Sequence, residues 1–504
     1  MKYKILENVN YTNVEIFDIK KNGIQIIEND NKIEIYNDPF RTVPLFISKN
    51  KNEELIIFSN FEDFYKFENV DKTIDEAGFW EIVLFGSGLW TRTLYKNVKQ
   101  MPAASKIIIE INTNKYKIEK YWDFNIKVDE SIDSMEKAAQ GLYDRLDGIF
   151  SKLDKNQKYV MGMSGGMDSR ITLAFLSKYI PKENLELFTY GFDERLLEYK
   201  YACEITETLS YNKSKFHKLT EESYKDAMEY LPKMSGGQIG VNHCHIIDYI
   251  KSNNTKNKVQ ISTYFSDAIF GWDSDSDKNI DVIENNFYKR IVEKTNLLAQ
   301  DIKESIINDS IKIFKNLNFN SNYCSLDEYK YVTERNQKFH MYLASIQNNF
   351  TNTDLVYANY DLLNYILTIP LKYREQKKLV DYILGNYFKN ISSRDFKNIS
   401  SRFQWGNAFS GVVEFYWFKF LNRVNSALRL LTRGRIQLFN KYQTEEQDRL
   451  LYRDFHKELK LATKKLLDNG LLTAEQKRKW DKLPVRSLGV GERFSLISIA
   501  KLLD

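Results

Sequence analysis

The stretch Val160–Arg170, "VMGMSGGMDSR", decides the fold of this chain. An apolar run leads into it, two glycines stand between Ser164 and Asp168, and an amphipathic segment follows. This order predicts a β-strand, a tight loop and the start of an α-helix. The amino end of a helix presents free N–H groups and a partial positive charge, and glycines let an anion approach the backbone closely. The stretch is therefore expected to bind the phosphates of a nucleotide.

The polar residues of this loop have separate roles in that prediction. Ser164 and Ser169 supply hydroxyl donors, while Gly165 and Gly166 leave the backbone bare. Asp168 cannot bind a phosphate itself, but it can bind the Mg²⁺ that accompanies one. The alternative is a structural Gly-Gly turn in which Asp168 caps the following helix. Because strand, loop and helix coincide here, we favour the nucleotide.

Predicted strands and helices alternate beyond this loop. The segments "LELFTYGF" at 185–192 and "KVQISTY" at 258–264 have the composition of strands, with amphipathic helices between them. Such alternation indicates a parallel sheet with crossover helices, in which ligands bind at the carboxyl ends of the strands. Gly191 stands at the end of one strand, where an adenosine would pass.

The regions on either side have other patterns. Residues 1 to about 125 contain short β-rich runs separated by turn residues, with one helix-like segment, which indicates an α+β domain. From about residue 275 onward, apolar residues recur at helical spacing. The repeat "FKNISSRD", "FKNISSRF" at 388–403 is explained most simply as a duplicated surface loop. The alternative is a pair of arginines, Arg394 and Arg402, that face an active site.

Composition restricts the function. The 504 residues carry a formal net charge of +5, which fits a phosphate pocket and is far from the charge of a nucleic-acid coat. Three scattered cysteines make a disulfide framework or a CxxC metal site implausible. The sequence shows neither a signal peptide nor an apolar run long enough to cross a membrane. We expect a cytoplasmic protein whose partners include neither nucleic acid nor a membrane.

Motifs along most of the chain resemble the asparagine synthetase superfamily, which includes the β-lactam synthetases and the lasso-peptide macrolactam synthetases. The matching stretches are "DPFRTVPLF" at 38–46, "SGGMDSR" at 164–170, "FTYGF" at 188–192, "STYFSDAIFG" at 262–271 and "VYANYDLLNYILTIPLKYR" at 356–374.

The resemblance implies a fold that combines α/β and α+β parts. Residues 1–125 would form a truncated, Ntn-hydrolase-like β-rich domain, a degenerate glutamine amidotransferase domain without its nucleophile. Residues 126–404 would form a PP-loop synthetase domain of the adenine nucleotide alpha hydrolase-like type, with a parallel α/β sheet. Residues 405–504 would form a helical C-terminal extension of that domain.

The chain also departs from the family pattern. The glutaminase of the family uses a cysteine at the mature N-terminus, whereas the second residue here is Lys2, and Arg41 replaces a glycine of the motif. Glutamine hydrolysis should therefore be absent. The second phosphate motif is "SGEGADE" in the family; here Ser262–Ala268 retains Asp267 but neither loop glycine. We therefore expect a divergent member that amidates a carboxylate other than aspartate.

The resemblance implies that the chain adenylates a carboxylate with ATP and Mg²⁺ and transfers it to ammonia or an amine, releasing AMP and diphosphate. The carboxylate would belong to a small molecule, a glycan or a peptide, and a homodimer is a possible assembly. Asp168 and Asp267 are the expected metal ligands. The expected ATP contacts are Met163, Ser164, Gly165, Gly166, Asp168, Ser169, Gly191, Ser262 and Asp267.

A catalytic lysine is implied in the segment after Pro370, because negative charge builds up at the α-phosphate. Lys378 is preferred over Lys377 and Lys372, although a solvent-exposed basic helix explains each lysine equally well. Glu334 and Arg335 fall where the family has residues near the acceptor, with a salt bridge inside a helix as an equally good explanation.

The segment "NHCH" at 242–245 brings His243 and His245 together with Cys244. Zinc would need a further ligand that the sequence does not show, so contact with the substrate is the favoured role.

Three functions stay open. The leading one is an AMP-forming amide ligase that acts on a small carboxylate or a sugar acid. The second is a macrolactam synthetase that joins an amine of a peptide to its own carboxylate. The third is a non-catalytic ATP-binding scaffold, which the replacement Thr263-Tyr264-Phe265 suggests and the retained Asp168 and Asp267 disfavour.

Overall fold

The computed structural model describes most of the chain, and the statements below concern these residues. They are 3–5, 11–111, 115–123, 126–253, 255–271, 298–315, 328–329, 331–391, 455–482 and 490–503, with short pieces between 416 and 438.

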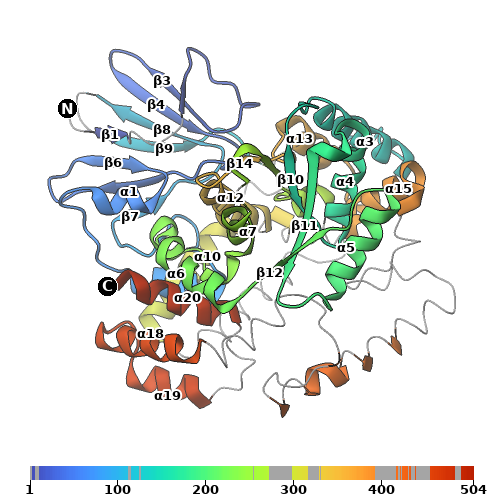
Figure 1. Ribbon diagram of the computed structural model, residues 1–504. Coiled ribbons are helices and arrows are strands. Elements are labelled where there is room, and N and C mark those ends of the chain that lie inside the picture. The colour runs from blue at the N-terminus through green and yellow to red at the C-terminus, as the bar shows by residue number, and fades with distance from the viewer. Residues whose placement is uncertain are drawn as a thin grey trace.

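A five-stranded parallel sheet extends from the middle to the right of the molecule in Figure 1. Its strand order is β12-β11-β10-β13-β14, and all neighbouring pairs are parallel. The parallel sheet confirms the α/β part of the prediction. The strands are β10 (Tyr159–Gly162), β11 (Leu185–Gly191), β12 (Lys215–Lys218), β13 (Val259–Ile261) and β14 (Asn352–Asp354).

The chain reverses its direction across this sheet at β10. It runs from β10 outward through β11 to β12, and then returns to the other side of β10 to form β13. In an open parallel sheet, the crevice at such a reversal is the preferred place for a ligand, because the loops on its two sides diverge. The loops after β10 and β13 therefore meet at one edge.

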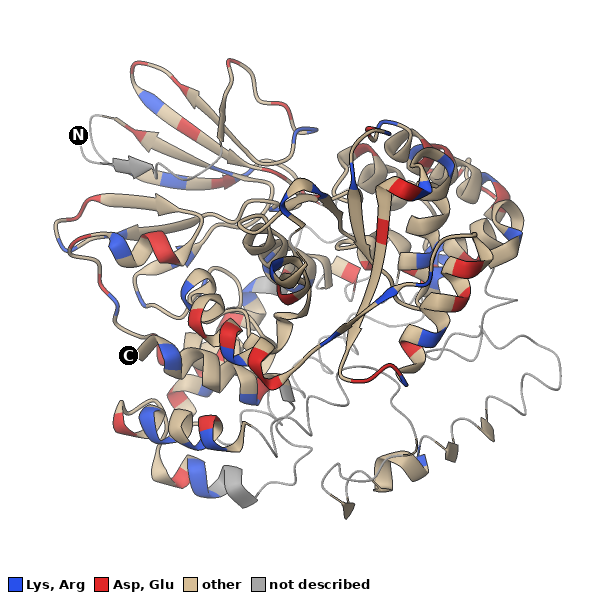
Figure 2. Ribbon diagram, viewed as in Figure 1, with Lys and Arg blue, Asp and Glu red and all other residues tan. Residues whose placement is uncertain are grey.

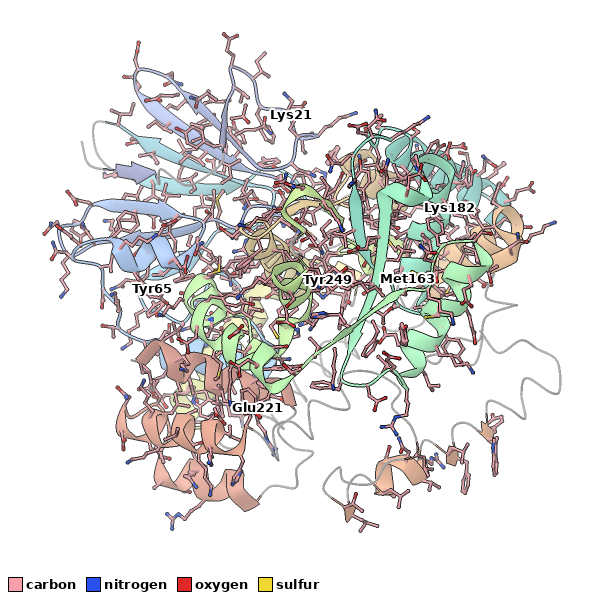
Figure 3. All side chains as sticks on the ribbon, viewed as in Figure 1. Lys21, Tyr65, Met163, Lys182, Glu221 and Tyr249 are labelled. Atoms are coloured by element: carbon pink, nitrogen blue, oxygen red, sulfur yellow. The ribbon has the colours of Figure 1, made fainter. Side chains whose placement is uncertain are left out.

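Helices cover both faces of the parallel sheet. One face carries a large apolar core with α3 (Met135–Phe150), α4 (Met167–Tyr179), α5 (Leu197–Thr208), α13 (Tyr360–Thr368) and α15 (Lys378–Tyr387). The other face carries α7 (His245–Ser252). Tyr249 of α7, labelled in Figure 3, stacks on Phe188 with ring centroids 3.6 Å apart.

Two further sheets lie in the N-terminal region, at the left of Figure 1. One has the order β2-β3-β4-β8-β9 and the other the order β1-β6-β5-β7, and antiparallel pairs predominate in both. Isoleucines of both sheets, such as Ile35 and Ile57, share one core. The strands are β1 (Tyr3–Ile5), β2 (Tyr11–Asn13), β3 (Ile24–Glu28), β4 (Lys32–Asn37), β5 (Phe46–Lys49), β6 (Leu55–Phe58), β7 (Val98–Gln100), β8 (Ser105–Glu110) and β9 (Tyr116–Lys120).

The assignment of these two sheets to an Ntn-hydrolase-like domain stays a prediction. The helix-like segment of this region is confirmed as α2 (Glu76–Phe85), which Asp75 caps at its amino end through the N–H of Gly78. A shorter helix, α1 (Phe61–Lys66), follows β6 and was not apparent from the sequence.

A second large core joins distant segments of the chain. It contains residues of α1 and α2, of α6 (Glu221–Ser235), and of the last helices of the chain. In Figure 1 the C-terminal helices lie below the N-terminal sheets and beside α6. The helices described beyond residue 299 are α10 (Gln300–Lys315), the π-helix η4 (Tyr331–His340), α12 (Met341–Gln347), α13, α14 (Leu371–Arg374), α15, α18 (His456–Asp468), α19 (Ala474–Lys482) and α20 (Val490–Ala500).

The helical character of the C-terminal part is thus confirmed for the described residues, apart from β14, which the sequence analysis missed. The three predicted domain ranges stay predictions, although one core contains residues from all three. None of the described helices is long and apolar enough to cross a membrane. Basic and acidic side chains are interspersed over the described elements (Figure 2).

Candidate active site

The loop between β10 and α4 has the conformation that its sequence predicts. Met163, labelled in Figure 3, follows β10 directly, and α4 begins at Met167 with Gly166 as its N-cap. No side chain caps this helix, so Asp168 is not the cap that the structural alternative required. An uncapped amino end of a helix is suited to an anion.

Hydrogen bonds inside the loop keep it closed around its glycines. The Ser169 hydroxyl donates to the Ser164 carbonyl at 2.8 Å, and the Gly166 N–H donates to the Ser164 hydroxyl at 3.1 Å. A Cβ on Gly165 would lie 2.6 Å from the Cβ of Tyr201 on α5, which real contacts do not allow. Glycine at position 165 is therefore needed for close packing of the loop on α5.

Two aspartates meet at the edge where the sheet reverses direction. Asp168 lies in the first turn of α4 after β10, and Asp267 lies in the first turn of α8 (Ser266–Phe270) after β13. The ammonium of Lys377 donates to Asp168 Oδ1 at 2.6 Å and to Asp267 Oδ1 at 2.8 Å. The Ser266 hydroxyl donates to Asp168 at 3.0 Å, and the Tyr331 hydroxyl donates to Asp267 at 3.2 Å.

Two carboxylates and one ammonium leave this cluster with an excess of negative charge. Burial and the neighbouring Asp267 together raise the pKa of Asp168 to about 7, against the opposing effect of Lys377. Burial acts in the same direction on Asp267, but Lys377 outweighs it and lowers that pKa to about 2. Burial lowers the pKa of Lys377, but both carboxylates together raise it above its usual value. One carboxyl of the pair is therefore hard to ionise without a further cation.

The donor set of this cluster fits Mg²⁺. Magnesium prefers oxygen ligands and is commonly held by one or two carboxylates together with phosphate oxygens and water. Asp168 and Asp267 supply two carboxylates, and their excess negative charge would be relieved by a divalent ion. No group of three or more His, Cys, Asp or Glu side chains with metal-binding geometry occurs among the described residues. The site therefore fits a metal that is shared with phosphate rather than one held by protein alone.

A cavity of about 610 Å³ opens beside the aspartate pair. That volume is in the range of pockets that bind cofactor-sized ligands. The loops after β10 and β13 form much of its wall, and His245 and Tyr190 stack on each other there with ring centroids 4.3 Å apart. The cavity is lined by all residues from 162 to 169 and by Thr189, Tyr190, Glu198, Tyr201, His245, Ile246, Gln260, Ile261, Ser262, Thr263, Tyr264, Asp267 and Lys377.

Most of the expected ATP contacts lie on this wall. They are Met163, Ser164, Gly165, Gly166, Asp168, Ser169, Ser262 and Asp267. Gly191 is not among the lining residues; its carbonyl accepts the N–H of Leu219, and its neighbours Thr189 and Tyr190 face the cavity instead. The end of β11 was therefore placed correctly, but the residue that meets the cavity differs.

The structure brings Lys377, and not Lys378, to the aspartates. Lys378 donates to Glu375 at 2.5 Å and to the Lys372 carbonyl at 3.3 Å, outside the cavity wall. Gln376 and Lys377 both adopt left-handed backbone conformations, with φ of 55° and 61°. This double turn before α15 points Lys377 inward, and a regular helical register could not have predicted it. The geometry therefore favours Lys377 over Lys378, and the catalytic role of either lysine stays a prediction.

Other predicted residues lie away from the cavity. Glu334 forms an ion pair with Lys338 at 2.5 Å, which is the helix salt bridge named as the alternative. Lys372 is exposed, with its ammonium 4.8 Å from the centroid of the Tyr373 ring. Arg394 and Arg402 lie outside the described residues.

The residues of the "NHCH" segment lie in different environments. His245 lines the cavity, whereas His243 packs edge-on against Phe339 with ring centroids 4.5 Å apart. Cys244 is buried in the second large core. The two histidines therefore do not act as one metal-binding pair.

Glu198 is the cavity residue that the sequence analysis missed. It lies in the first turn of α5, and burial raises its pKa to about 7. It lines the cavity and makes no hydrogen bond or ion pair with a described residue. Its only sequence signal was an acidic residue one turn before Tyr201, which an ordinary amphipathic helix also explains.

Comparison with known proteins gives a distant similarity. No protein-family model matches the chain. An NH(3)-dependent NAD(+) synthetase from Thermoplasma acidophilum is 25% identical over 170 residues, which cover 32% of this chain and 69% of that protein. A solved NH3-dependent NAD synthetase from Campylobacter jejuni, in complex with the nitrate ion, is 15% identical with a TM-score of 0.22, and the match covers 42% of this chain and 96% of that one.

Proposed function

We propose that the protein is an ATP-dependent amide ligase that forms AMP and diphosphate. The observation that carries the proposal is the meeting of Asp168, Asp267 and Lys377 beside a cavity of about 610 Å³ at the edge where the parallel sheet reverses. The distant similarity to NH3-dependent NAD(+) synthetases supports the same coarse class. We further propose that the chain is a divergent relative of the asparagine synthetase superfamily that uses ammonia or an amine.

The proposed reaction has two steps. An oxygen of the substrate carboxylate attacks the α-phosphorus of ATP, the bond from that phosphorus to the bridging oxygen breaks, and diphosphate leaves. The nitrogen of ammonia or an amine then attacks the acyl carbon, the bond to the AMP oxygen breaks, and AMP leaves with the electron pair. An amide remains.

The residues of the site divide the work as follows. The uncapped amino end of α4 and the Ser164 hydroxyl would bind the phosphates. Mg²⁺ held by Asp168 and Asp267 would neutralise charge on the leaving diphosphate. The Lys377 ammonium would stabilise the charge that develops at the α-phosphate and at the acyl oxygen.

The amine is proposed to come from solution or from the second substrate. The described cysteines are poor nucleophiles, because burial raises the pKa of both Cys203 and Cys244. Cys324 lies outside the described residues. The N-terminal sheets would then be a structural remnant of an amidotransferase domain. Purified protein supplied with glutamine should release no glutamate in step with AMP.

The conformation of the second phosphate loop favours a catalytic function over a passive scaffold. Phe265 replaces a glycine of the family motif but adopts the left-handed conformation that glycine would have, with φ of 74°. Asp267 therefore still reaches Asp168 and Lys377. A scaffold that binds ATP without chemistry would have no need for this buried, charged cluster, which is costly to fold.

The test is an ATP–diphosphate exchange assay with a panel of carboxylates that includes small acids, sugar acids and peptide acids. Asp168→Asn and Asp267→Asn should each abolish exchange and AMP formation, because each removes a metal ligand. The matched control is Asp144→Asn on the exposed side of α3, which should leave activity unchanged.

Wild-type AMP production in either active-site variant would refute the assignment of the metal ligands. Exchange with peptide acids alone would assign the macrolactam synthetase. Tight ATP binding without exchange on any member of the panel would favour the scaffold.

A further inference from the structure

Arg335 forms no ion pair in the described part of the chain, although the charge of Asp267 acts on it at longer range, in the direction that raises its pKa. Its guanidinium carbon lies 4.0 Å from the centroid of the Phe339 ring. A Cβ added to Gly86, at the end of α2, would lie 3.9 Å from its Nη1. No ion pair or hydrogen bond joins Arg335 to another described residue. The adjacent carboxylate, Glu334, is occupied by Lys338 at 2.5 Å.

An unpaired, half-buried guanidinium is unfavourable for the folded protein. Burial lowers the pKa of Arg335, yet arginine stays charged at neutral pH. A charge removed from water without a partner raises the free energy of the folded state, and this penalty disappears when an anion binds. Among the other buried or half-buried arginines, Arg374 is paired with Glu328 and Arg92 with Asp75 and Asp309. Arg41 and Arg170 instead donate to backbone carbonyls.

The histidines near Arg335 add no competing positive charge. Burial and the charge of Arg335 together lower the pKa of His340 to about 3, against the opposing effect of Asp267. The pKa of His243 is lowered for the same two reasons. Both rings are therefore neutral at physiological pH and can donate or accept hydrogen bonds. Neither histidine therefore competes with Arg335 for an anion.

The position of Arg335 relates it to the proposed active site. His340 stacks on Tyr264, with ring centroids 5.4 Å apart and planes 4° apart, and Tyr264 lines the cavity. Tyr331, on the same π-helix as Arg335, donates to Asp267. Arg335 is thus near the Tyr264 and Asp267 end of the cavity, although it is not itself one of the lining residues.

We propose that Arg335 binds a second anionic group of the substrate, so that the substrate carries a further carboxylate, phosphate or sulfate besides the carboxylate that is adenylated. This inference rests on the proposed function and specifies its substrate class. Guanidinium groups bind such anions through two parallel hydrogen bonds, which fixes orientation as well as affinity. A substrate held in this way at one end would direct its other end toward Asp267 and Lys377.

The phosphates of ATP do not need Arg335. Lys377 and the amino end of α4 already face the cavity where the phosphates would lie. Arg335 lies beyond its wall, and the aromatic pair of Tyr264 and His340 is near it. The second anion is therefore assigned to the carboxylate substrate and not to the nucleotide.

The experiment compares ligands that differ by one charge. Glutarate, its monoamide and 4-phosphonobutanoate are each titrated with MgATP onto the full chain, and binding is followed by calorimetry and by the Michaelis constant for ATP–diphosphate exchange. The variants are Arg335→Gln, which removes the charge, and Arg335→Lys, which retains it. Arg145→Gln on the exposed face of α3 is the control.

Wild-type protein should bind the two dianions at least about tenfold more tightly than the monoamide, the gain typical of a charge-assisted pair. Arg335→Gln should erase that difference and leave the Michaelis constant for ATP unchanged, while Arg335→Lys keeps part of the preference. A stronger effect with the phosphonate than with glutarate would identify phosphate as the group that is bound.

Equal affinity of wild-type protein for the diacid and the monoamide would overturn the inference, and so would a preference that survives in Arg335→Gln. A raised Michaelis constant for ATP in Arg335→Gln would assign the arginine to the nucleotide instead. If ATP–diphosphate exchange proceeds equally well with the monoamide and with the dianions, the proposed function stands and only this inference is rejected.

Discussion

At the scale of single residues, the chemistry depends on how charges are balanced in a small volume. Asp168 and Asp267 approach each other because one follows β10 and the other follows β13, and Lys377 offsets only part of their repulsion. Such a cluster is poised to accept a divalent ion, because the ion supplies the missing positive charge. Lys377 would then be released to act on the developing charge of the reaction.

Replacement of Lys377 tests that role. Lys377→Met retains most of the apolar stem and removes the ammonium, so we expect AMP formation to fall by about 10²–10³, the loss typical of one preorganised electrostatic donor. Lys378→Met is the matched control, because it disrupts only the ion pair with Glu375 outside the cavity. The measurement is AMP release at saturating ATP. Loss of activity in the control alone would return the catalytic role to Lys378.

The raised pKa of Glu198 predicts that the stability of the protein depends on pH. Burial raises its pKa from 4.5 to about 7, so the folded protein holds a proton that the unfolded chain has already released. The free energy of unfolding should therefore fall as pH rises from about 4.5 to about 7, and remain lower above that range. Glu198→Gln should remove this part of the pH dependence and be more stable than wild-type protein at pH ~8. Urea unfolding at several pH values measures it; parallel profiles for the two proteins would contradict the prediction.

At the scale of elements, the loop from β13 to α8 has a left-handed backbone conformation at Phe265, a residue other than glycine. Phe265 holds the left-handed conformation of a glycine, which is strained for a side chain of this size. Burial compensates for the strain: Phe265 is 1% exposed and packs edge-on against Phe40, with ring centroids 4.9 Å apart. Phe40 belongs to the N-terminal motif at 38–46, so the first region helps to hold the second phosphate loop.

Substitutions of Phe265 should separate strain from burial. Phe265→Ala loses the buried ring and keeps the strain, so we expect a loss of roughly 3–5 kcal/mol in the free energy of unfolding. Phe265→Gly loses the same ring but relieves the backbone, so it should be about 1 kcal/mol more stable than the alanine variant. Denaturant unfolding gives both values. A glycine variant that is less stable than the alanine variant would show that the loop changes conformation.

At the scale of the whole molecule, the end of the chain stabilises its beginning. Phe494 of α20 is fully buried and stacks on Tyr224 of α6, with ring centroids 5.7 Å apart. The same core includes Trp80 of α2, and the Val241 N–H donates to the Ser498 hydroxyl. The N-terminal region, α6 and the last helix therefore share one apolar interior.

Truncation of Phe494 should destabilise the whole of that apolar interior. Phe494→Ala leaves a cavity, so we expect a loss of roughly 3–5 kcal/mol in the free energy of unfolding. Amide hydrogen exchange should rise in α2 as well as in α20, because both contribute to the core. The control is Leu461→Ala on α18, which is 68% exposed and should change stability by no more than about 0.5 kcal/mol. Faster exchange confined to α20 would show that the regions unfold separately.

Local patterns were enough to predict several parts of the site. The strand, glycine loop and helix at 160–179 follow from apolar spacing and from the conformational freedom of glycine, which act within a few residues. Asp168 and Asp267 were paired through the resemblance to the asparagine synthetase superfamily, in which both motifs contribute to the phosphate site. Glu198 escaped prediction, since an acidic residue in the first turn of a helix is ordinary and only its packing makes it unusual.

The sequence by itself determined the strand, the glycine loop and the helix at 160–179 and the parallel sheet that carries them, because these depend on short-range periodicity and on the residues that tight turns require. Asp267 was identified through the family resemblance. Only the tertiary structure decided which lysine reaches the aspartates and that the last helix packs against the first region. Those outcomes depend on contacts between residues far apart in the chain, where a single left-handed residue or one long-range packing contact redirects a side chain by several ångströms.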